Sequence, residues 1–263
     1  MAKKRLKTVT AGRLVFGVCY SQAKATDSAK ARAAKTKCST MARRALNFRA
    51  AWQKLRLILC ANFSRGDLWV TLGYDDDHLP ANRKEAKKKM QLFIDKLRAA
   101  RRRSGEELRY VYNIEEIQED GSRRLHHHMV LQAGAARNDF ELIRSLWTFG
   151  SNIEIRKLGE HEIFADGFLE LAQYMCKERN PEAKVYNVGD KCWIGSRNLA
   201  RPETESEIVS DNVTITAPPG AVILDKHSEA NEYGSFDYIV YLLPAAPPHA
   251  ADPPRRKRKP KKA

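Results

Sequence analysis

The chain has 263 residues, of which 43% are apolar, so it is long enough for one sizeable domain with appendages and for a buried core. No run approaches eighteen apolar residues, and the apolar patch behind the basic start is too short and broken for a signal peptide, which argues against secretion and a membrane span. The five cysteines are scattered without a C-x-x-C pair, which argues against a disulfide framework and favours a reducing compartment, the cytoplasm.

The net charge of +15 is concentrated at the two ends of the chain. Residues 1–50 hold 13 Lys and Arg against the single acid Asp27, and residues 253–263 hold seven basic residues and no acid. Such ends attract phosphate through counterion release, although a basic tail is also typical of targeting signals. We expect a loosely ordered or helical basic arm over residues 1–50 and a disordered basic tail over residues 244–263.

The clearest elements follow the arm. Residues 68–74, LWVTLGY, alternate in apolarity as a half-buried strand does, and DDDHLP ends that strand. Residues 83–103 place apolar side chains at helical spacing and carry ten basic residues against two acidic ones, so one face of this helix packs and the other is positive. Residues 109–118 and 124–132 flank the turn sequence EDGS and predict a β-hairpin.

The rest of the chain alternates between helical and extended patterns. The expected elements are a short helix over 139–147, a strand over 152–158, a longer helix over 164–179, a hairpin over 184–195, a closing segment over 196–202, and strands over 213–216, 221–225 and 236–243 with acidic linkers. This order predicts an α+β fold, an antiparallel sheet with helices packed on it, close to the ferredoxin-like pattern. We divide the chain into the arm, a central domain over 51–202, an accessory β segment over 203–243 and the tail.

Three consecutive histidines, His126, His127 and His128, lie on the second strand of the central hairpin. Side chains alternate faces along a strand, so His126 and His128 point one way and His127 the other. The apolar Met129 and Leu131 share the face of His127, which predicts that His127 faces the core. Two imidazoles on one strand face could share a metal ion; the alternative is a surface histidine cluster without an ion.

The partner strand offers a third ligand. A turn centred on Asp120 and Gly121 places Glu115 opposite His126 and Asn113 opposite His128. A change of one residue in this register would substitute Glu116 for Glu115. Two imidazoles and a carboxylate leave positions open for water or a phosphate oxygen, as a catalytic ion requires.

A tyrosine and a lysine on the later helix could supply a nucleophile. Tyr174 and Lys177 are separated by three residues, so they are neighbours on one helix face. The reference pKa of tyrosine is about 10, so its hydroxyl attacks only where a nearby ammonium or metal favours the phenolate. Lys177 could also neutralise charge on a phosphate. The alternative is a tyrosine at the border of an amphipathic helix beside a solvated lysine.

Four stretches, in this order, resemble the HUH-type endonucleases, specifically the replication initiators of small circular single-stranded DNA phages and rolling-circle plasmids. LWVTLGYDDDHLP resembles the first motif of the family, RLHHHMVL its His-hydrophobic-His metal motif, QYMCK its Tyr-x-x-Lys motif, and WIGSRNLARP a short Ser-Arg-Asn-Leu element. The likeness spans residues 66–202. It departs from the family at His127, where the family has an aliphatic residue, and this departure allows a register in which His127 is the ligand.

The resemblance implies a nicking enzyme with one catalytic tyrosine, Tyr174, assisted by Lys177. Its divalent ion, Mg²⁺ or Mn²⁺, would be held by Glu115, His126 and His128. A 5′-phosphotyrosyl link would form and release a 3′-hydroxyl that primes synthesis, and a later transfer of the bound 5′ end would close a circle. These steps would initiate and terminate rolling-circle replication.

The implied partner is single-stranded DNA of the replication origin, with host helicase and polymerase as further partners and no membrane. The positive helix over 83–103 and the basic arms would hold the strand, and Trp69 or Trp193 would stack bases. Two alternatives remain at this point: a relaxase or transposase with the same chemistry, and a non-enzymatic basic nucleic-acid-binding protein. The sequence contains no P-loop motif, so no motor domain decides between them.

Overall fold

The computed structural model describes residues 3–21, 41–117, 123–135, 138–159, 161, 165–180, 191–231 and 234–244. Its helices are α1 (Met41–Asn62), α2 (Arg83–Arg103), α3 (Asp139–Leu146) and α4 (Leu169–Met175), with 3-10 turns η1 (Asp76–His78) and η3 (Lys177–Arg179). Its strands are β1 (Lys3–Ala11), β2 (Leu14–Ser21), β3 (Leu68–Leu72), β4 (Tyr110–Ile117), β5 (Arg123–Leu131), β6 (Ile153–Lys157), β7 (Ile194–Gly195), β8 (Glu203–Ser210), β9 (Val222–Asn231) and β10 (Gly234–Leu242). Within these ranges, no helix is long and apolar enough to cross a membrane.

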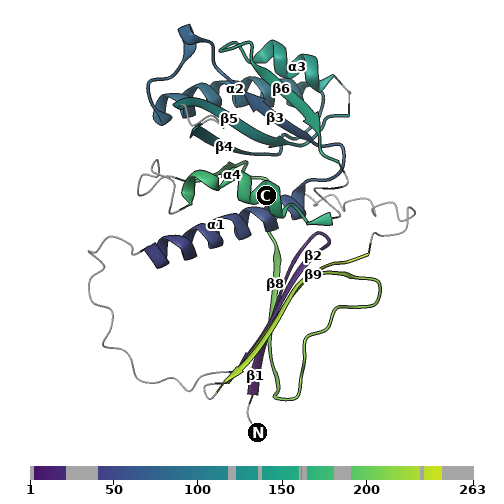
Figure 1. The fold of residues 1–263 in the computed structure, drawn as a ribbon. Coiled ribbons are helices and arrows are strands. Elements are labelled where there is room, and N and C mark those ends of the chain that lie inside the picture. Colours follow the sequence, from purple (N-terminus) through teal and green to yellow (C-terminus); the bar gives the residue numbers. More distant parts are fainter. Residues whose placement is uncertain are drawn as a thin grey trace, which may run out of the picture.

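The strands form two five-stranded antiparallel sheets, drawn at the top and bottom of Figure 1. The first sheet has the order β6-β3-β5-β4-β7, and its chain runs β3-α2-β4-β5-α3-β6. This order, with β5 inserted between β3 and β4, is the split βαβ arrangement of ferredoxin-like folds. The predicted α+β class is therefore confirmed.

Helices α2 and α3 cover one face of the first sheet (Figure 1). The buried side chains of α2 include the predicted apolar stripe, Met90, Phe93, Ile94 and Leu97. The helix begins at Arg83 because the Asn82 side chain accepts a hydrogen bond from the backbone nitrogen of Glu85 (3.0 Å) and caps the first turn. The solvent side is basic, so α2 presents a positive ridge on the outside of the molecule.

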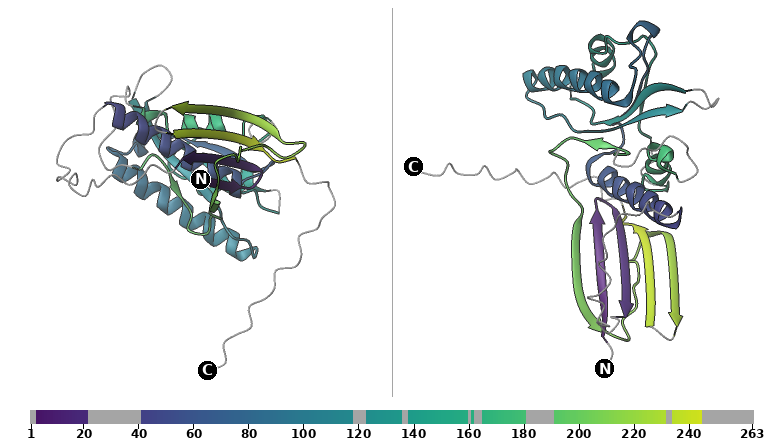
Figure 2. Two further views of the ribbon diagram at one scale, coloured as in Figure 1. Left: turned by 90° about the horizontal axis from the view of Figure 1, so that it is seen from below. Right: turned by 90° about the vertical axis from the view of Figure 1, so that its left-hand side faces the viewer.

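Helices α1 and α4 cover the other face of the first sheet and contact each other between the two sheets (Figures 1 and 2). Helix α4 is shorter than the expected helix over 164–179. Phe168 has a left-handed backbone (φ 61°), which a right-handed helix cannot contain, and beyond Met175 the chain tightens into η3. Phe164 and most of the hairpin expected over 184–195 lie outside the described residues.

The second sheet, in the order β8-β1-β2-β10-β9, corrects the expectation for the start of the chain. Residues 3–21, expected to be loosely ordered or helical, form β1 and β2, which pair around Gly12 (φ 56°). The helical expectation holds from Met41 onward, where α1 begins. The basic residues of β1 hid the strand because sheet pairing, not apolar alternation, holds this segment extended.

The second sheet also corrects one expectation and confirms two for residues 203–243. Strand β8 is acidic and was expected to be a linker, but it pairs with β1 along its whole length. Residues 213–216 form no strand, although their alternation predicts one. Strands β9 and β10 contain most of the apolar segments predicted over 221–225 and 236–243.

A buried ion-pair network ties the end of α2 to the start of α3. Arg101 is 4% exposed and contacts the carboxylates of Asp139 and Glu106 and the carbonyl oxygen of Gln132 (3.1 Å). Removing the cation would leave the buried Asp139 carboxylate without its counter-charge. We expect Arg101→Met to lower the free energy of unfolding by about 3–5 kcal/mol, measured by urea titration. Arg103→Met, exposed on the same helix, should change it by less than about 0.5 kcal/mol, and equal stability of the two variants would contradict the network's role.

Candidate metal centre and nucleophile

The candidate metal ligands lie on the paired strands β4 and β5. Glu115 pairs with His126 and Asn113 pairs with His128, so the predicted register is confirmed. The ladder is irregular beyond Glu115, and the turn predicted around Asp120 and Gly121 lies outside the described residues. Because both strands keep their alternation up to this point, Glu115, His126 and His128 share one face of the sheet.

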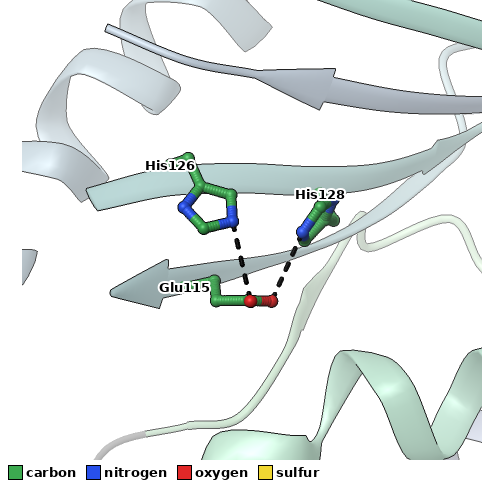
Figure 3. A group of neighbouring side chains, drawn as sticks. All are labelled: Glu115, His126 and His128. Atoms are coloured by element: carbon green, nitrogen blue, oxygen red, sulfur yellow. Dashed lines mark ion pairs between the residues drawn. The ribbon is translucent and has the colours of Figure 1, made fainter. Parts of the chain in front are cut away.

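Glu115, His126 and His128 form one compact group (Figure 3). The Nε2 atom of His126 is 3.6 Å from Glu115 Oε1, and the Nε2 atom of His128 is 3.3 Å from Glu115 Oε2. The ligand atoms of the three side chains all lie within 4.8 Å of one another, so they could hold one metal ion. The alternative ligand Glu116 instead places its carboxylate 3.6 Å from Arg123.

The second nitrogen of each imidazole is engaged by a neighbour. His126 Nδ1 is 2.9 Å from the carbonyl oxygen of Arg124, and His128 Nδ1 is 3.2 Å from the hydroxyl of Thr71. The Trp69 ring stacks on His128, with ring centroids 5.1 Å apart and an interplanar angle of 11°. These contacts fix the ring orientations that point both Nε2 atoms at Glu115, as outer partners of metal-binding histidines do.

The chemistry of the group fits a divalent cation. Glu115 is 1% exposed, and its Oε2 atom makes no hydrogen bond with the described residues, so a buried carboxylate oxygen is left for a cation to satisfy. Burial raises the pKa of Glu115, but its contacts with His128 and Lys177 lower it more, so the carboxylate is ionised at neutral pH. Burial lowers the pKa of His126, which favours the neutral imidazole that a metal ion requires.

His127 faces the opposite side of the sheet, as strand alternation predicts. It is fully buried, its Nε2 atom lies 2.6 Å from the hydroxyl of Tyr74, and its ring contacts the rings of Tyr112 and Trp147. Burial lowers the pKa of His127 to about 3, so this imidazole is neutral. The departure from the resembled motif is therefore a core residue that packs under α2.

Tyr174 brings its hydroxyl to the same imidazole as Glu115. Its Oη atom is 3.2 Å from His128 Nε2, the nitrogen that also faces the carboxylate. Lys177 Nζ lies 2.5 Å from Glu115 Oε1 and 4.0 Å from the centroid of the Tyr174 ring. Burial lowers the pKa of Lys177, but Glu115 and Tyr174 raise it more, so the side chain is an ammonium at neutral pH. The structure thus gathers all the site residues that the sequence predicts.

Three residues that the sequence reasoning missed dock the Tyr174 segment on β4. The Asn113 side chain donates to the carbonyl oxygen of Met175 (3.0 Å), and Glu178 accepts from the backbone nitrogens of Glu116 and Ile117, the latter at 2.9 Å. Arg83 of α2 donates to Glu178 (2.8 Å) and to the carbonyl oxygen of Ile114 (2.6 Å). Alternation already placed Asn113 on the site face, but no sequence signal pairs Arg83 with Glu178.

The aromatic residues expected to stack DNA bases have other contacts. Trp69 is 7% exposed and packs against His128 and the edge of Tyr174 (centroids 6.0 Å apart), so it has no free face for a base. Trp193 is partly buried against the core around α1, and its Nε1 atom donates to the carbonyl oxygen of Ala51 (3.4 Å). The expectation of base stacking by Trp69 is wrong because the ring supports the site from beneath.

Comparison with protein families gives one match. Residues 67–179 match the family described as Replication-associated protein, ORF2 type. The matched segment runs from the residue before β3 to the end of η3 and contains Glu115, His126, His128, Tyr174 and Lys177. No significant match was found among curated proteins or among solved structures. The chain therefore contains a segment similar to replication-associated proteins, which supports a role in replication.

Proposed function

We propose that the protein nicks and rejoins single-stranded DNA to initiate and terminate rolling-circle replication in the cytoplasm of a host cell. One observation carries this proposal: the hydroxyl of Tyr174 and the buried carboxylate of Glu115 meet at the same Nε2 atom of His128, at 3.2 and 3.3 Å. A potential nucleophile therefore lies beside a group that could hold a metal ion. The similarity of residues 67–179 to replication-associated proteins supports the replication context.

The proposed reaction is a transesterification. The Tyr174 oxygen forms a bond to the scissile phosphorus, the bond from phosphorus to the 3′-oxygen breaks, and that oxygen takes up a proton from water while the phenol loses its own. Lys177, whose ammonium lies against the Tyr174 ring, favours the phenolate. A divalent ion held by Glu115, His126 and His128 would polarise the phosphate. Attack on the phosphotyrosine by another 3′-hydroxyl reverses the step and rejoins DNA.

A covalent adduct tests this function directly. The full-length protein is incubated with labelled single-stranded circular DNA and Mn²⁺ or Mg²⁺, and the mixture is run on a denaturing gel. We expect labelled DNA that migrates with the protein, and none when the metal is chelated. Salt-dependent DNA binding without an adduct on any substrate would instead support a non-enzymatic nucleic-acid-binding protein. A relaxase or transposase would form the adduct but would prefer transfer or transposon-end sequences over a replication origin.

Glu178 is expected to position Tyr174 without touching DNA. Glu178→Ala removes the acceptor for two backbone nitrogens of β4 and the partner of Arg83, so the Tyr174 segment loses its attachment beyond Met175. We expect the rate of adduct formation at saturating DNA to fall by about 10–100-fold, because a misplacement of about 1 Å can cost this much. The KM for DNA should stay unchanged, as measured by single-turnover kinetics.

The control for this prediction removes an acid from the exposed side of the same helix. Glu170→Ala on α4 carries the same charge change and should leave the rate unchanged. Glu178→Gln, which retains one acceptor oxygen, should recover part of the lost rate. A Glu178→Ala variant that raises KM without lowering the rate would show that Glu178 acts on DNA binding instead.

A further inference from the structure

A groove of about 890 Å³ lies between the second half of α2 and the edge strand β7, away from the Tyr174 site. Three arginines line it, Arg98 and Arg102 from α2 and Arg197 from the loop after β7. Ser196 and Asn198 line the same groove, so it contains the start of the Ser-Arg-Asn-Leu element. The proposed nicking reaction gives this element no role, and it lies beyond the segment that matches replication-associated proteins.

The positive charge of the groove is available to a ligand. Within the described ranges, the side chains of Arg102 and Arg197 form no ion pair or hydrogen bond, and both are exposed. Arg98 forms a surface ion pair with Asp95 (2.6 Å, side chains 43% and 53% exposed), which contributes little. Burial raises the pKa of Tyr110 at the groove floor, and the charges of Arg98 and Arg197 oppose this rise, so both guanidinium groups act on the same hydroxyl.

The carboxylates that line the groove are already engaged. Glu106 accepts hydrogen bonds from the buried Arg101 and from the backbone nitrogen of Ala135 (2.9 Å). Glu107 lies 3.4 Å from the amide of Asn198 and 3.9 Å from Arg109. The three lining arginines therefore exceed the free negative charge, and an anion is the complementary ligand.

The groove lies at a distance from the Tyr174 site that favours a flanking segment of the same DNA. Tyr110 of the groove and Glu115 of the site are five residues apart on β4, about 17 Å along the strand, and their side chains face opposite sides of the sheet. Strand β7, which borders the groove, is the edge of this sheet. A DNA strand that passes around this edge could reach both places, whereas a single phosphate could not.

We propose that this groove binds the phosphate backbone of the single strand that flanks the nick, through Arg98, Arg102 and Arg197. The inference rests on the proposed function for the identity of the DNA. Guanidinium groups bind phosphate oxygens, and the one aromatic ring in the lining, Tyr110, is 5% exposed and offers no stacking surface. The groove therefore contributes affinity without sequence preference.

The salt dependence of binding tests the groove. Fluorescence anisotropy is measured with the full chain carrying Tyr174→Phe, so that no cleavage interferes, and a labelled single-stranded oligonucleotide over a series of NaCl concentrations. Arg102→Gln with Arg197→Gln should weaken binding by about tenfold and reduce the slope of log K against log salt by about 1.4, since each single-strand phosphate contact contributes about 0.7. The loss should be the same for unrelated base sequences.

A matched control removes two charges elsewhere. Arg144→Gln with Lys226→Gln takes the same charge from exposed positions on α3 and β9, outside the groove, and should leave the slope within experimental error. If the groove variant and this control behave alike, the groove does not bind DNA. If inorganic tripolyphosphate binds the wild-type groove tightly but long oligonucleotides do not compete with it, the groove binds a small polyanion and the proposal is wrong.

The adduct assay separates this inference from the proposed function. On a short oligonucleotide that covers the nick alone, the Arg102 and Arg197 double variant with Tyr174 intact should form the adduct as the wild type does. On a long oligonucleotide at limiting concentration it should form less. A wild-type protein that forms no adduct, together with the expected change of slope, would overturn the nicking function and leave the groove as a DNA-binding surface.

Discussion

Tyr174→Phe is expected to abolish the covalent adduct, a loss on the order of 10⁶-fold when a covalent nucleophile is removed. The substitution deletes only the hydroxyl that lies 3.2 Å from His128 Nε2. The ring keeps its contacts with Trp69, His128 and Lys177, so the helix and the group around Glu115 should remain in place. DNA affinity, measured by anisotropy, should change by less than about threefold, because binding comes mainly from basic groups elsewhere.

The control for this experiment is a tyrosine remote from the site. Tyr241→Phe on β10 of the second sheet should form the adduct at the wild-type rate. An adduct that persists in Tyr174→Phe would mean that another tyrosine attacks. Tyr186, which lies outside the described residues, would then be the first to substitute, and mass spectrometry of the DNA-linked peptide would identify it.

Local pattern was sufficient to predict the candidate site. The hairpin of β4 and β5 is formed by residues close in sequence, so alternation and a short turn fixed both its register and its faces. The same alternation separated His127 from His126 and His128 because Met129 and Leu131 mark the core face. The helical spacing of Tyr174 and Lys177 gave their common face, although the helix itself ends between them at Met175.

Contacts between distant segments could not be predicted in this way. Strands β1 and β8 are about 200 residues apart and rich in charge, so nothing local marks them as partners. The pair of Arg83 and Glu178 connects the start of α2 to the end of the Tyr174 segment, and each residue alone is typical of a solvated helix surface. The left-handed Phe168, which starts α4 late, has a side chain that usually disfavours this conformation.

The positive charge of the molecule also has a different distribution from the one expected. Part of the basic N-terminal arm is β1, whose Lys4 is 8% exposed and lies 3.9 Å from Asp211, so this charge is partly neutralised within the second sheet. The exposed basic ridge of α2 and the groove beside β7 keep their charge instead. Among the described residues, the surfaces that suit a phosphate backbone therefore border the first sheet, which also carries Tyr174.

His126→Ala combined with His128→Ala is expected to remove metal binding, with a loss of more than about 100-fold in Mn²⁺ affinity, the upper end of what losing an outer-shell partner costs. The two substitutions leave Glu115 as the only ligand of the group. Isothermal titration calorimetry with Mn²⁺ measures the affinity independently of cleavage. The adduct should be lost in parallel, while salt-dependent DNA binding should persist because its charges lie elsewhere.

His127 provides the discriminating control because it lies between the two proposed ligands but on the other face. His127→Ala leaves a cavity and the unpaired hydroxyl of Tyr74, so it should lower the free energy of unfolding by about 2–5 kcal/mol. His127→Gln, which keeps a hydrogen-bonding group, should fold more stably than His127→Ala and bind Mn²⁺ as the wild type does. If His127→Gln folds but loses the ion while the His126 and His128 double variant retains it, the imidazole of His127 is the ligand, and the faces drawn from strand alternation do not describe the metal-bound protein.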